Sequence, residues 1–172
     1  MHIESLMWLF PIAFMFHDFE EIIFLPAWIK NNATYLTSKY PRIGKKLVLN
    51  YKNKSSSAFA LAVFEEFIIL VILTLICVEL KYYSFFAALA LAYLTHVIVH
   101  VIQFIALKKY IPAVGSAVLT GIYNIYSLYT LDYLGFLNWE YIGILTPPVI
   151  IVMGLNLFFA LWLADKIMAL EK

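Results

Sequence analysis

The chain has little charge for its length. Of its 172 residues, 13% are charged and 64% are hydrophobic, and the mean hydropathy is +0.87. Soluble globular domains carry about 25% charged residues, so this composition excludes that class. It is the composition of an integral membrane protein whose first partner is the lipid bilayer.

Cysteine and recognisable soluble-enzyme motifs are also scarce. The single cysteine, Cys77, lies in an apolar stretch, so no internal disulfide can form. The sequence contains no Gly-x-Ser-x-Gly elbow, no phosphate-binding glycine loop, no His-Glu-x-x-His motif and no internal repeat. It has no nucleic-acid-binding signature either, and we expect no nucleic-acid partner.

Long apolar stretches dominate the rest of the chain. Stretches long enough to cross a bilayer as helices lie at about 6–28, 58–80, 84–107, 111–134 and 141–164. With short connections between them, they predict an all-α membrane protein, a five-helix transmembrane bundle that forms one domain over residues 1–172.

Basic residues are concentrated in two of the connections. The first connection and its borders carry Lys30, Lys39, Arg42, Lys45, Lys46, Lys52 and Lys54, and the third carries Lys108 and Lys109. Because Lys and Arg are enriched in cytoplasmic loops, we expect the N-terminus outside and the C-terminus in the cytoplasm. The basic segment 34–50 either lies along the anionic inner leaflet or forms a solvated cytoplasmic loop.

The first apolar stretch contains the run His17-Asp18-Phe19-Glu20-Glu21. An Asp or Glu at the centre of a spanning helix costs about 2.5–3.5 kcal/mol on the insertion scale. Ionisable residues at such depth are functional candidates because something must compensate that cost.

Two further stretches carry ionisable residues at the same depth. At a rise of about 1.5 Å per residue, Glu65 and Glu66 reach the level of Glu21. The third stretch places His96 near the depth of His17, and His100 near the depth of Glu21. Three helices are therefore predicted to direct ionisable side chains into one layer of the bilayer.

Helical spacing sharpens this prediction, because residues three or four apart share a face. Imidazole and carboxylate ligands suit zinc or iron, as one or two ions, better than calcium or magnesium. The predicted metal ligands are His17, Glu20, Glu21, Glu66, His96 and His100. The competing interpretations are glutamates neutralised by protonation on burial and a histidine pair that only joins helices.

Other polar residues are assigned supporting roles. Glu65 points about 100° away from Glu66, so it is predicted to relay protons or support a ligand, and Glu20 and Glu65 are the candidate general bases. Residues predicted to support the ligands are Asp18, Gln103, Tyr123 and Asn124. Asn156 is interpreted as part of a kink near Pro147 and Pro148.

The motifs resemble those of a known family. His17-x-x-Glu20-Glu21, Phe64-Glu65-Glu66, His96-x-x-x-His100-x-x-Gln103 and Lys109-Tyr110-Ile111-Pro112 occur in this order. Together they resemble the HXXEE-motif family of small bacterial integral membrane proteins, over nearly the whole chain. The resemblance implies a shared intramembrane site and a multi-pass protein of the bacterial inner membrane. It implies no particular reaction.

Three functions are compatible with these sequence features. The first is an intramembrane metal-dependent enzyme, either a hydrolase or a di-metal oxidoreductase, acting on a lipid-like substrate. The second is a small transporter of protons or metal ions. A single chain of this length is small for a transporter, and a homodimer would supply the missing size. The third is a structural protein whose polar cluster only joins its helices.

Overall fold

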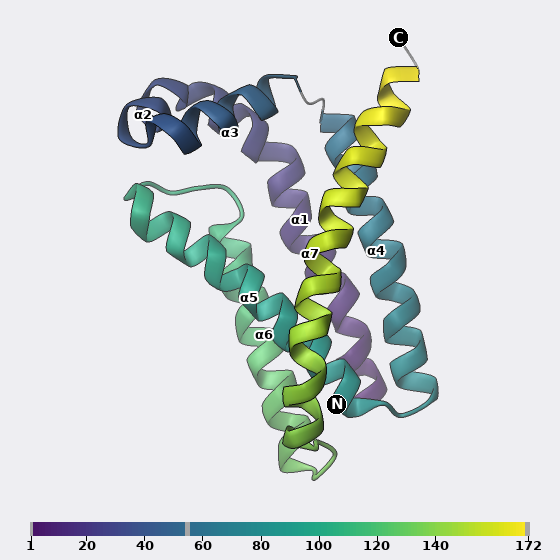
Figure 1. Ribbon diagram of the computed structural model, residues 1–172. Coiled ribbons are helices and arrows are strands. Elements are labelled where there is room, and N and C mark those ends of the chain that lie inside the picture. The colour runs from purple at the N-terminus through teal and green to yellow at the C-terminus, as the bar shows by residue number, and fades with distance from the viewer. Residues whose placement is uncertain (1, 54–55, 171–172) are drawn as a thin grey trace.

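The computed structural model describes residues 2–53 and 56–170, and within these ranges it contains helices and no strands (Figure 1). The prediction of an all-α fold is therefore confirmed. The helices are α1 (Ile3–Asn31), α2 (Ala33–Lys39), α3 (Pro41–Asn53), α4 (Ser56–Glu79), α5 (Tyr83–Leu107), α6 (Val114–Tyr133) and α7 (Trp139–Leu170).

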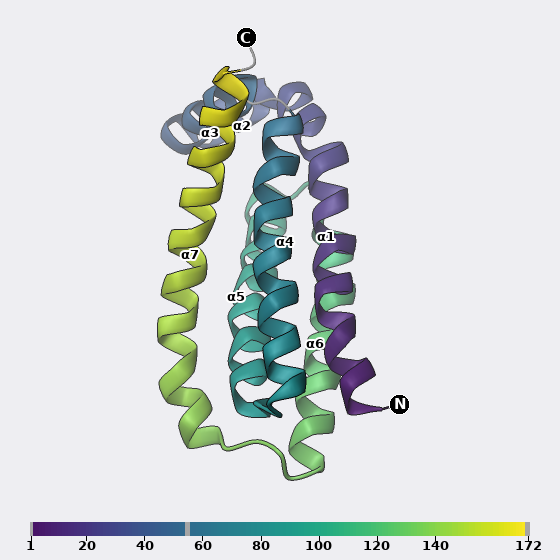
Figure 2. The same ribbon diagram turned by 90° about the vertical axis from the view of Figure 1, so that its right-hand side faces the viewer.

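Five of these helices coincide with the predicted apolar stretches. Helices α1, α4, α5, α6 and α7 extend along the long dimension of the molecule, and α2 and α3 lie across one end (Figures 1 and 2). Helix α7 continues without interruption through Pro147 and Pro148.

Three of the helices are long and apolar enough to cross a membrane. Helices α4, α5 and α7 contain segments with hydropathies of 2.7, 2.1 and 2.1. Helix α1 has spanning length but carries the acidic cluster, and α6 carries a stripe of Ser, Thr, Tyr and Asn side chains. These two helices therefore owe their place in the bundle to partners for their polar groups.

The main hydrophobic core lies between α1, α5 and α6. Phe10 packs edge-on against Phe86 and Tyr93, with ring centroids 5.5 and 5.7 Å apart, and Met7 and Ala117 complete the contact. Met7 and Phe10 belong to the first half of α1, the half that begins at the N-terminus (Figure 2). It holds α1 and α5 together, and both helices then continue into the polar cluster.

Helix α7 changes partners along its length. Near its start, Ile142 packs on Ala87 and Ala90 of α5, whereas Ala160 and Ala164 later pack on alanines of α4. Small residues allow such close approach of membrane helices. The later part of α5 is left uncovered, and Ile98, Ile102 and Ile105 are 55%, 57% and 64% exposed.

Helices α2 and α3 form a hairpin that covers the end of α5. The last carbonyl groups of a helix lack partners within it, and here side chains of the hairpin supply them. Tyr35 and Lys39 donate hydrogen bonds to the carbonyl oxygen of Leu107, and Tyr40 donates to that of Ala106. The basic segment 34–50 is therefore a pair of helices and not an irregular loop.

The hairpin depends on a close approach at Gly44, which predicts the effect of one substitution. A Cβ at position 44 would lie 2.2 Å from the carbonyl oxygen of Leu36. We expect Gly44→Ala to force α2 and α3 apart and to destabilise the protein by about 1–3 kcal/mol, as overpacking does. The measurements are thermal unfolding in detergent and proteolysis of the segment 32–53.

The matched control is Gly143→Ala in α7, where nothing lies within 4 Å of the added methyl group. We expect this variant to match or exceed the parent in stability, because alanine favours helix more than glycine does. Equal unfolding temperatures and cleavage patterns for the two variants would contradict the tight hairpin.

Candidate metal centre

Four side chains from two helices converge in the middle of the bundle. They are His17 and Glu21 of α1 and His96 and His100 of α5, and one ligand atom from each lies within 4.8 Å of all the others. His17, Glu21 and His100 are buried and His96 is half-buried. This group can hold a metal ion.

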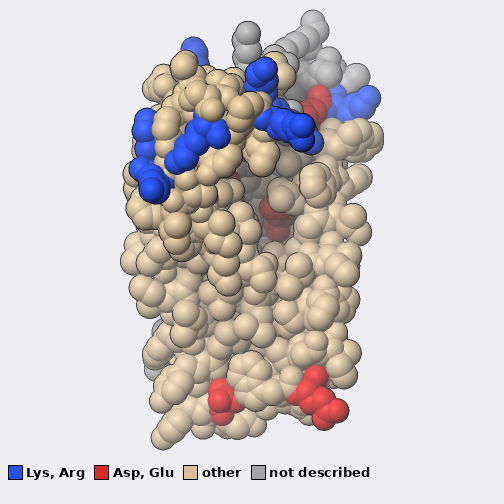
Figure 3. All heavy atoms as spheres, turned by 60° about the vertical axis from the view of Figure 1, so that its left-hand side comes forward, with Lys and Arg blue, Asp and Glu red and all other residues tan. Residues whose placement is uncertain are grey.

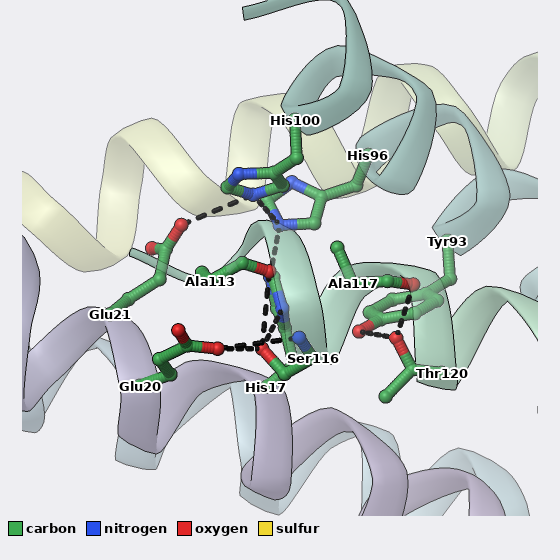
Figure 4. Close-up of polar contacts among 10 residues, drawn as sticks. All are labelled: His17, Glu20, Glu21, Tyr93, His96, His100, Ala113, Ser116, Ala117 and Thr120. Carbon is green, nitrogen blue, oxygen red and sulfur yellow. Dashed lines mark hydrogen bonds and ion pairs between the residues drawn. The ribbon is translucent and has the colours of Figure 1, made fainter. Parts of the chain in front are cut away.

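The contacts within this group follow the depths expected from the sequence. His17 Nε2 lies 3.0 Å from His96 Nε2, and His100 Nε2 lies 3.1 Å from Glu21 Oε1 (Figure 4). His96 Nε2 also lies 2.9 Å from His100 Nε2. Each residue of α1 is therefore opposite the α5 histidine that was expected at its level.

The spacing suits a single ion. Ligands at about 2.0–2.2 Å from a tetrahedral ion lie roughly 3.3–3.6 Å from one another. The three adjacent pairs, at 2.9–3.1 Å, would move apart by a few tenths of an ångström, and the other pairs, which lie within 4.8 Å of one another, would close around the ion. Three imidazole nitrogens and one carboxylate oxygen are also a donor set that transition metals accept.

A hydrogen-bonded chain behind His17 determines which of its nitrogens faces the cluster. Glu20 accepts hydrogen bonds from the hydroxyls of Ser116 and Tyr110, both at 2.6 Å, and from the Ser116 amide at 3.3 Å. With its proton directed to Glu20, the Ser116 hydroxyl accepts from Nδ1 of His17 at 3.2 Å. Nε2 of His17 is then unprotonated and presents its lone pair to the cluster, as a metal ligand must.

Protons alone do not satisfy the cluster while Glu21 is ionised and the three histidines are neutral. If His96 donates to the bare Nε2 of His17 and His100 donates to Glu21, then two N–H groups face each other across 2.9 Å. If His100 instead carries no proton at Nε2, its lone pair faces the carboxylate across 3.1 Å. A proton on Glu21, a second proton on His17 or a shared cation removes this conflict.

The ring of Tyr93 packs against two of the imidazoles on the side that faces the hydrophobic core. The ring of Tyr93 lies edge-on to His17, with centroids 6.2 Å apart, and 5.9 Å from that of His96. The Tyr93 hydroxyl is hydrogen-bonded to Thr120 at 3.1 Å (Figure 4). Two of the histidines are thereby held between a rigid ring and the polar cluster.

The structure does not bring every predicted ligand into the group. Glu20 lies on the Ser116 side of His17, engaged by α6, and not among the four converging atoms. Glu66 of α4 is also outside the group, although it interacts electrostatically with Glu21. Glu65 accepts a hydrogen bond of 3.1 Å from Asn156, so Asn156 joins α7 to α4.

The structure also places only some of the predicted supporting residues near the four-residue group. Asp18 is buried and interacts electrostatically with Glu21 and Glu66. Asn124 is fully buried but donates to the Thr120 carbonyl of its own helix, and Tyr123 donates to the carbonyl of Leu6. Gln103 is exposed on α5. Of these supporting residues, Asp18 is the one with a described interaction with a member of the group.

Sequence reasoning missed Ser116 and Tyr110 as partners of the site. Ser116 belongs to the polar stripe of α6, where small polar residues most often join helices. Tyr110 lies in the connection between α5 and α6, and its hydrogen bond to Glu20 raises the pKa of the Tyr110 phenol. One signal for these partners was present in the sequence. The motif residue Tyr110 is close to Ser116 along the chain, so both side chains can reach one carboxylate.

These features define a helical membrane-type protein with a buried cluster of histidines and a glutamate that can bind a metal. Residues 8–130 match the family described as "Protein of unknown function with HXXEE motif", and the chain belongs to this family. No curated protein and no solved structure gives a significant match.

The hydrogen bonds that connect Glu20, Ser116 and His17 predict the effect of removing the Ser116 hydroxyl. We expect Ser116→Ala to weaken metal binding by about 10–100-fold, the usual loss when a partner of a ligating histidine is removed. Affinity is measured by competition with a chromophoric chelator.

The matched control is Ser127→Ala on the same helix, because the contacts described for the Ser127 hydroxyl are with Tyr123 and not with the cluster. We expect this control to bind metal as the parent does. A Ser116→Ala protein with unchanged affinity would show that the hydroxyl does not support His17 as a ligand.

Proposed function

We propose that the chain is an intramembrane metal-dependent enzyme that acts on a lipid-like substrate. The observation that carries the proposal is the convergence of His17, Glu21, His96 and His100 on one point inside an apolar bundle. Polar side chains that only join membrane helices do so by hydrogen bonds across the helix interface. Here three Nε2 atoms and a carboxylate oxygen meet at one point, which is the geometry of a ligand set.

The proposed topology has five spans, with α1 and α6 crossing beside α4, α5 and α7. Lys and Arg gather at the end where α2 and α3 lie, and acidic side chains lie at the opposite end and in a hollow partway along this face (Figure 3). The basic end is assigned to the cytoplasm by the positive-inside rule. This supports an N-terminus outside and a cytoplasmic C-terminus, and the location we propose, from the family resemblance, is the bacterial inner membrane.

Access to the cluster supports a substrate that arrives from the bilayer. His96 and Glu20 are half-buried, and the adjoining part of α5 is uncovered because α7 has moved to α4. The large exposed side chains there are isoleucine, valine and phenylalanine, with Gln103 among them as a polar side chain. An apolar chain meets a compatible surface on this side of the site, whereas a small polar solute does not.

The residues have distinct proposed roles. His17, His96, His100 and Glu21 hold the ion, and Ser116 with Glu20 keeps Nε2 of His17 unprotonated. A zinc ion bound there supplies Lewis acidity for hydrolysis, and iron supplies redox chemistry. Glu65 and Glu66 are half-buried on α4 and are the carboxylates free of the ligand set that can accept or return a proton.

Metal analysis of the purified protein tests the proposal. We expect metal to copurify, with zinc favouring hydrolysis and iron favouring oxidation, and to be lost from His100→Gln with an affinity reduced by more than about 100-fold. The control is His2→Gln, which changes an exposed histidine outside the cluster. Absence of metal after loading with zinc, iron or manganese would overturn the proposal.

Exchange kinetics and flux distinguish an enzyme from a transporter. We expect the bound ion to exchange slowly, and liposomes containing the protein to show no metal or proton flux. A flux that disappears in Glu21→Gln would replace the proposed enzyme by a transporter that uses the same cluster.

A further inference from the structure

Basic side chains gather at the end of the bundle where α2 and α3 lie (Figure 3). Positions 22–64 and 80–131 contain no Asp or Glu, yet they hold every Lys and Arg of the chain except Lys166 and Lys172. The cations of the hairpin are therefore not matched by acidic residues of the same segments. Uncompensated charge of one sign on a surface attracts a partner of the opposite charge.

Two lysines at this end are held against one aromatic ring. Lys39 Nζ donates hydrogen bonds to the Tyr35 hydroxyl at 3.0 Å and to the Leu107 carbonyl oxygen at 3.2 Å. Lys109 Nζ lies 4.3 Å from the centre of the Tyr35 ring and donates to Asn32 Oδ1 at 3.1 Å. All of these partners are neutral, so the ammonium groups are held in place while their charge remains available to an anion. Each still has at least one N–H group for a further acceptor.

A hollow of about 330 Å³ lies next to Lys39, at the turn between α2 and α3. It is lined by Lys39, Tyr40, Pro41, Arg42 and Ile43. Its volume is at the lower end of the range of about 300–1,000 Å³ found for small-molecule sites. Most of the lining surface is apolar, as the stems of lysine and arginine are when their charged ends reach water. The hollow therefore combines an apolar lining with two cationic residues.

The exposed face of α3 repeats this combination. Arg42, Lys45 and Lys46 are exposed, and in a helix of 3.6 residues per turn they project within about 100° of one another. Ile43 and Leu49, beside them, are 71% and 59% exposed. Helices that lie at a membrane surface place cations next to apolar side chains that enter the acyl boundary. Helix α3 thus presents both kinds of contact that an anionic lipid offers.

The position of the hairpin places these groups at the level of lipid headgroups. It lies across the end of the long helices (Figures 1 and 2), and its Tyr35 and Tyr40 bind the last carbonyl groups of α5. Helix α5 is apolar and long enough to cross a membrane, and its Ile102 and Ile105, near that end, are 57% and 64% exposed. An apolar zone therefore lies on one side of the hairpin, and the aqueous edge of the bilayer lies on the other.

We propose that the hairpin is a binding site for an anionic phospholipid of the adjacent leaflet. Lys39 and Arg42 contact the phosphate of its headgroup, Lys109 adds positive potential next to Lys39, and the glycerol backbone with the first part of the acyl chains occupies the apolar hollow. A free phosphate ion would satisfy the cations but leave that lining without a partner, so a lipid fits better. The inference does not depend on the proposed metal centre.

Lipid binding to the full chain in detergent tests the proposal. Phosphatidylglycerol and phosphatidylcholine with identical acyl chains are titrated separately, and bound lipid is counted by native mass spectrometry. We expect phosphatidylglycerol to bind at least about 10-fold more tightly, because two basic residues near an anionic headgroup each contribute about 5-fold. In Arg42→Gln we expect its affinity to fall about 5-fold with phosphatidylcholine binding unchanged. Arg42→Lys, which keeps the charge, is expected to retain most of the affinity.

The choice of Arg42 separates lipid binding from folding. Arg42 is exposed, and the described hydrogen bonds from the hairpin to α5 are made by Tyr35, Lys39 and Tyr40. We therefore expect thermal unfolding of Arg42→Gln to match that of the parent. The matched control is Lys166→Gln, which removes one exposed cation on α7 at the same end of the molecule (Figure 1). This control is expected to bind phosphatidylglycerol as the parent does.

Glycerol phosphate, a soluble compound with the same phosphate chemistry, distinguishes a lipid site from a site for free phosphates. We expect a hundredfold excess of it to leave phosphatidylglycerol bound. Ile43→Ser removes part of the apolar lining of the hollow and keeps both cations. We expect this variant to bind phosphatidylglycerol several-fold more weakly than the parent.

The outcomes are distinct. Equal affinity of the parent for the two lipids overturns the proposal, and so does an affinity that is unchanged in Arg42→Gln or in Ile43→Ser. A loss in Lys166→Gln as large as that in Arg42→Gln also overturns it, because the basic end then attracts anions without a defined site. Displacement of the lipid by glycerol phosphate replaces the lipid by a soluble phosphate compound as the occupant.

Discussion

The structure depends on how buried carboxylates and imidazoles are neutralised in a bundle without internal basic residues. Lys and Arg occur at the ends of the apolar helices and not within them. Glu20 is satisfied by hydroxyl and amide donors from α6, and Glu21 meets the imidazole of His100. The polar cluster therefore joins α1 to both α5 and α6, and its stability depends on what positive charge enters it.

Much of the fold could be predicted from hydropathy and length. Helices α1, α4, α5, α6 and α7 occupy the predicted stretches, with ends that differ by a few residues. Depth along each helix then paired His17 with His96 and Glu21 with His100, because the helical rise is nearly constant. Depth does not tell which way a side chain points, and this is why Glu20 and Glu66 were grouped with the ligands.

What escaped prediction depends on tilt and local packing. The alanines of α4 and α7 let these helices meet at one end only, and composition alone does not place such a crossing. Ser116 looked like any other small polar residue of a membrane helix, yet it reaches both Glu20 and His17. The hairpin of α2 and α3 escaped because basic amphipathic segments fold according to the surface on which they rest.

The attachment of that hairpin to the end of α5 connects the surface helices α2 and α3 to the site. Tyr35 and Lys39 bind the carbonyl of Leu107, about two helical turns beyond His100. Helix α5 contributes two of the four converging residues. A displacement of α2 and α3 would therefore change the tilt of α5 and with it the position of those imidazoles. The position of the basic hairpin and the arrangement of the two α5 imidazoles are thus mechanically connected through one helix.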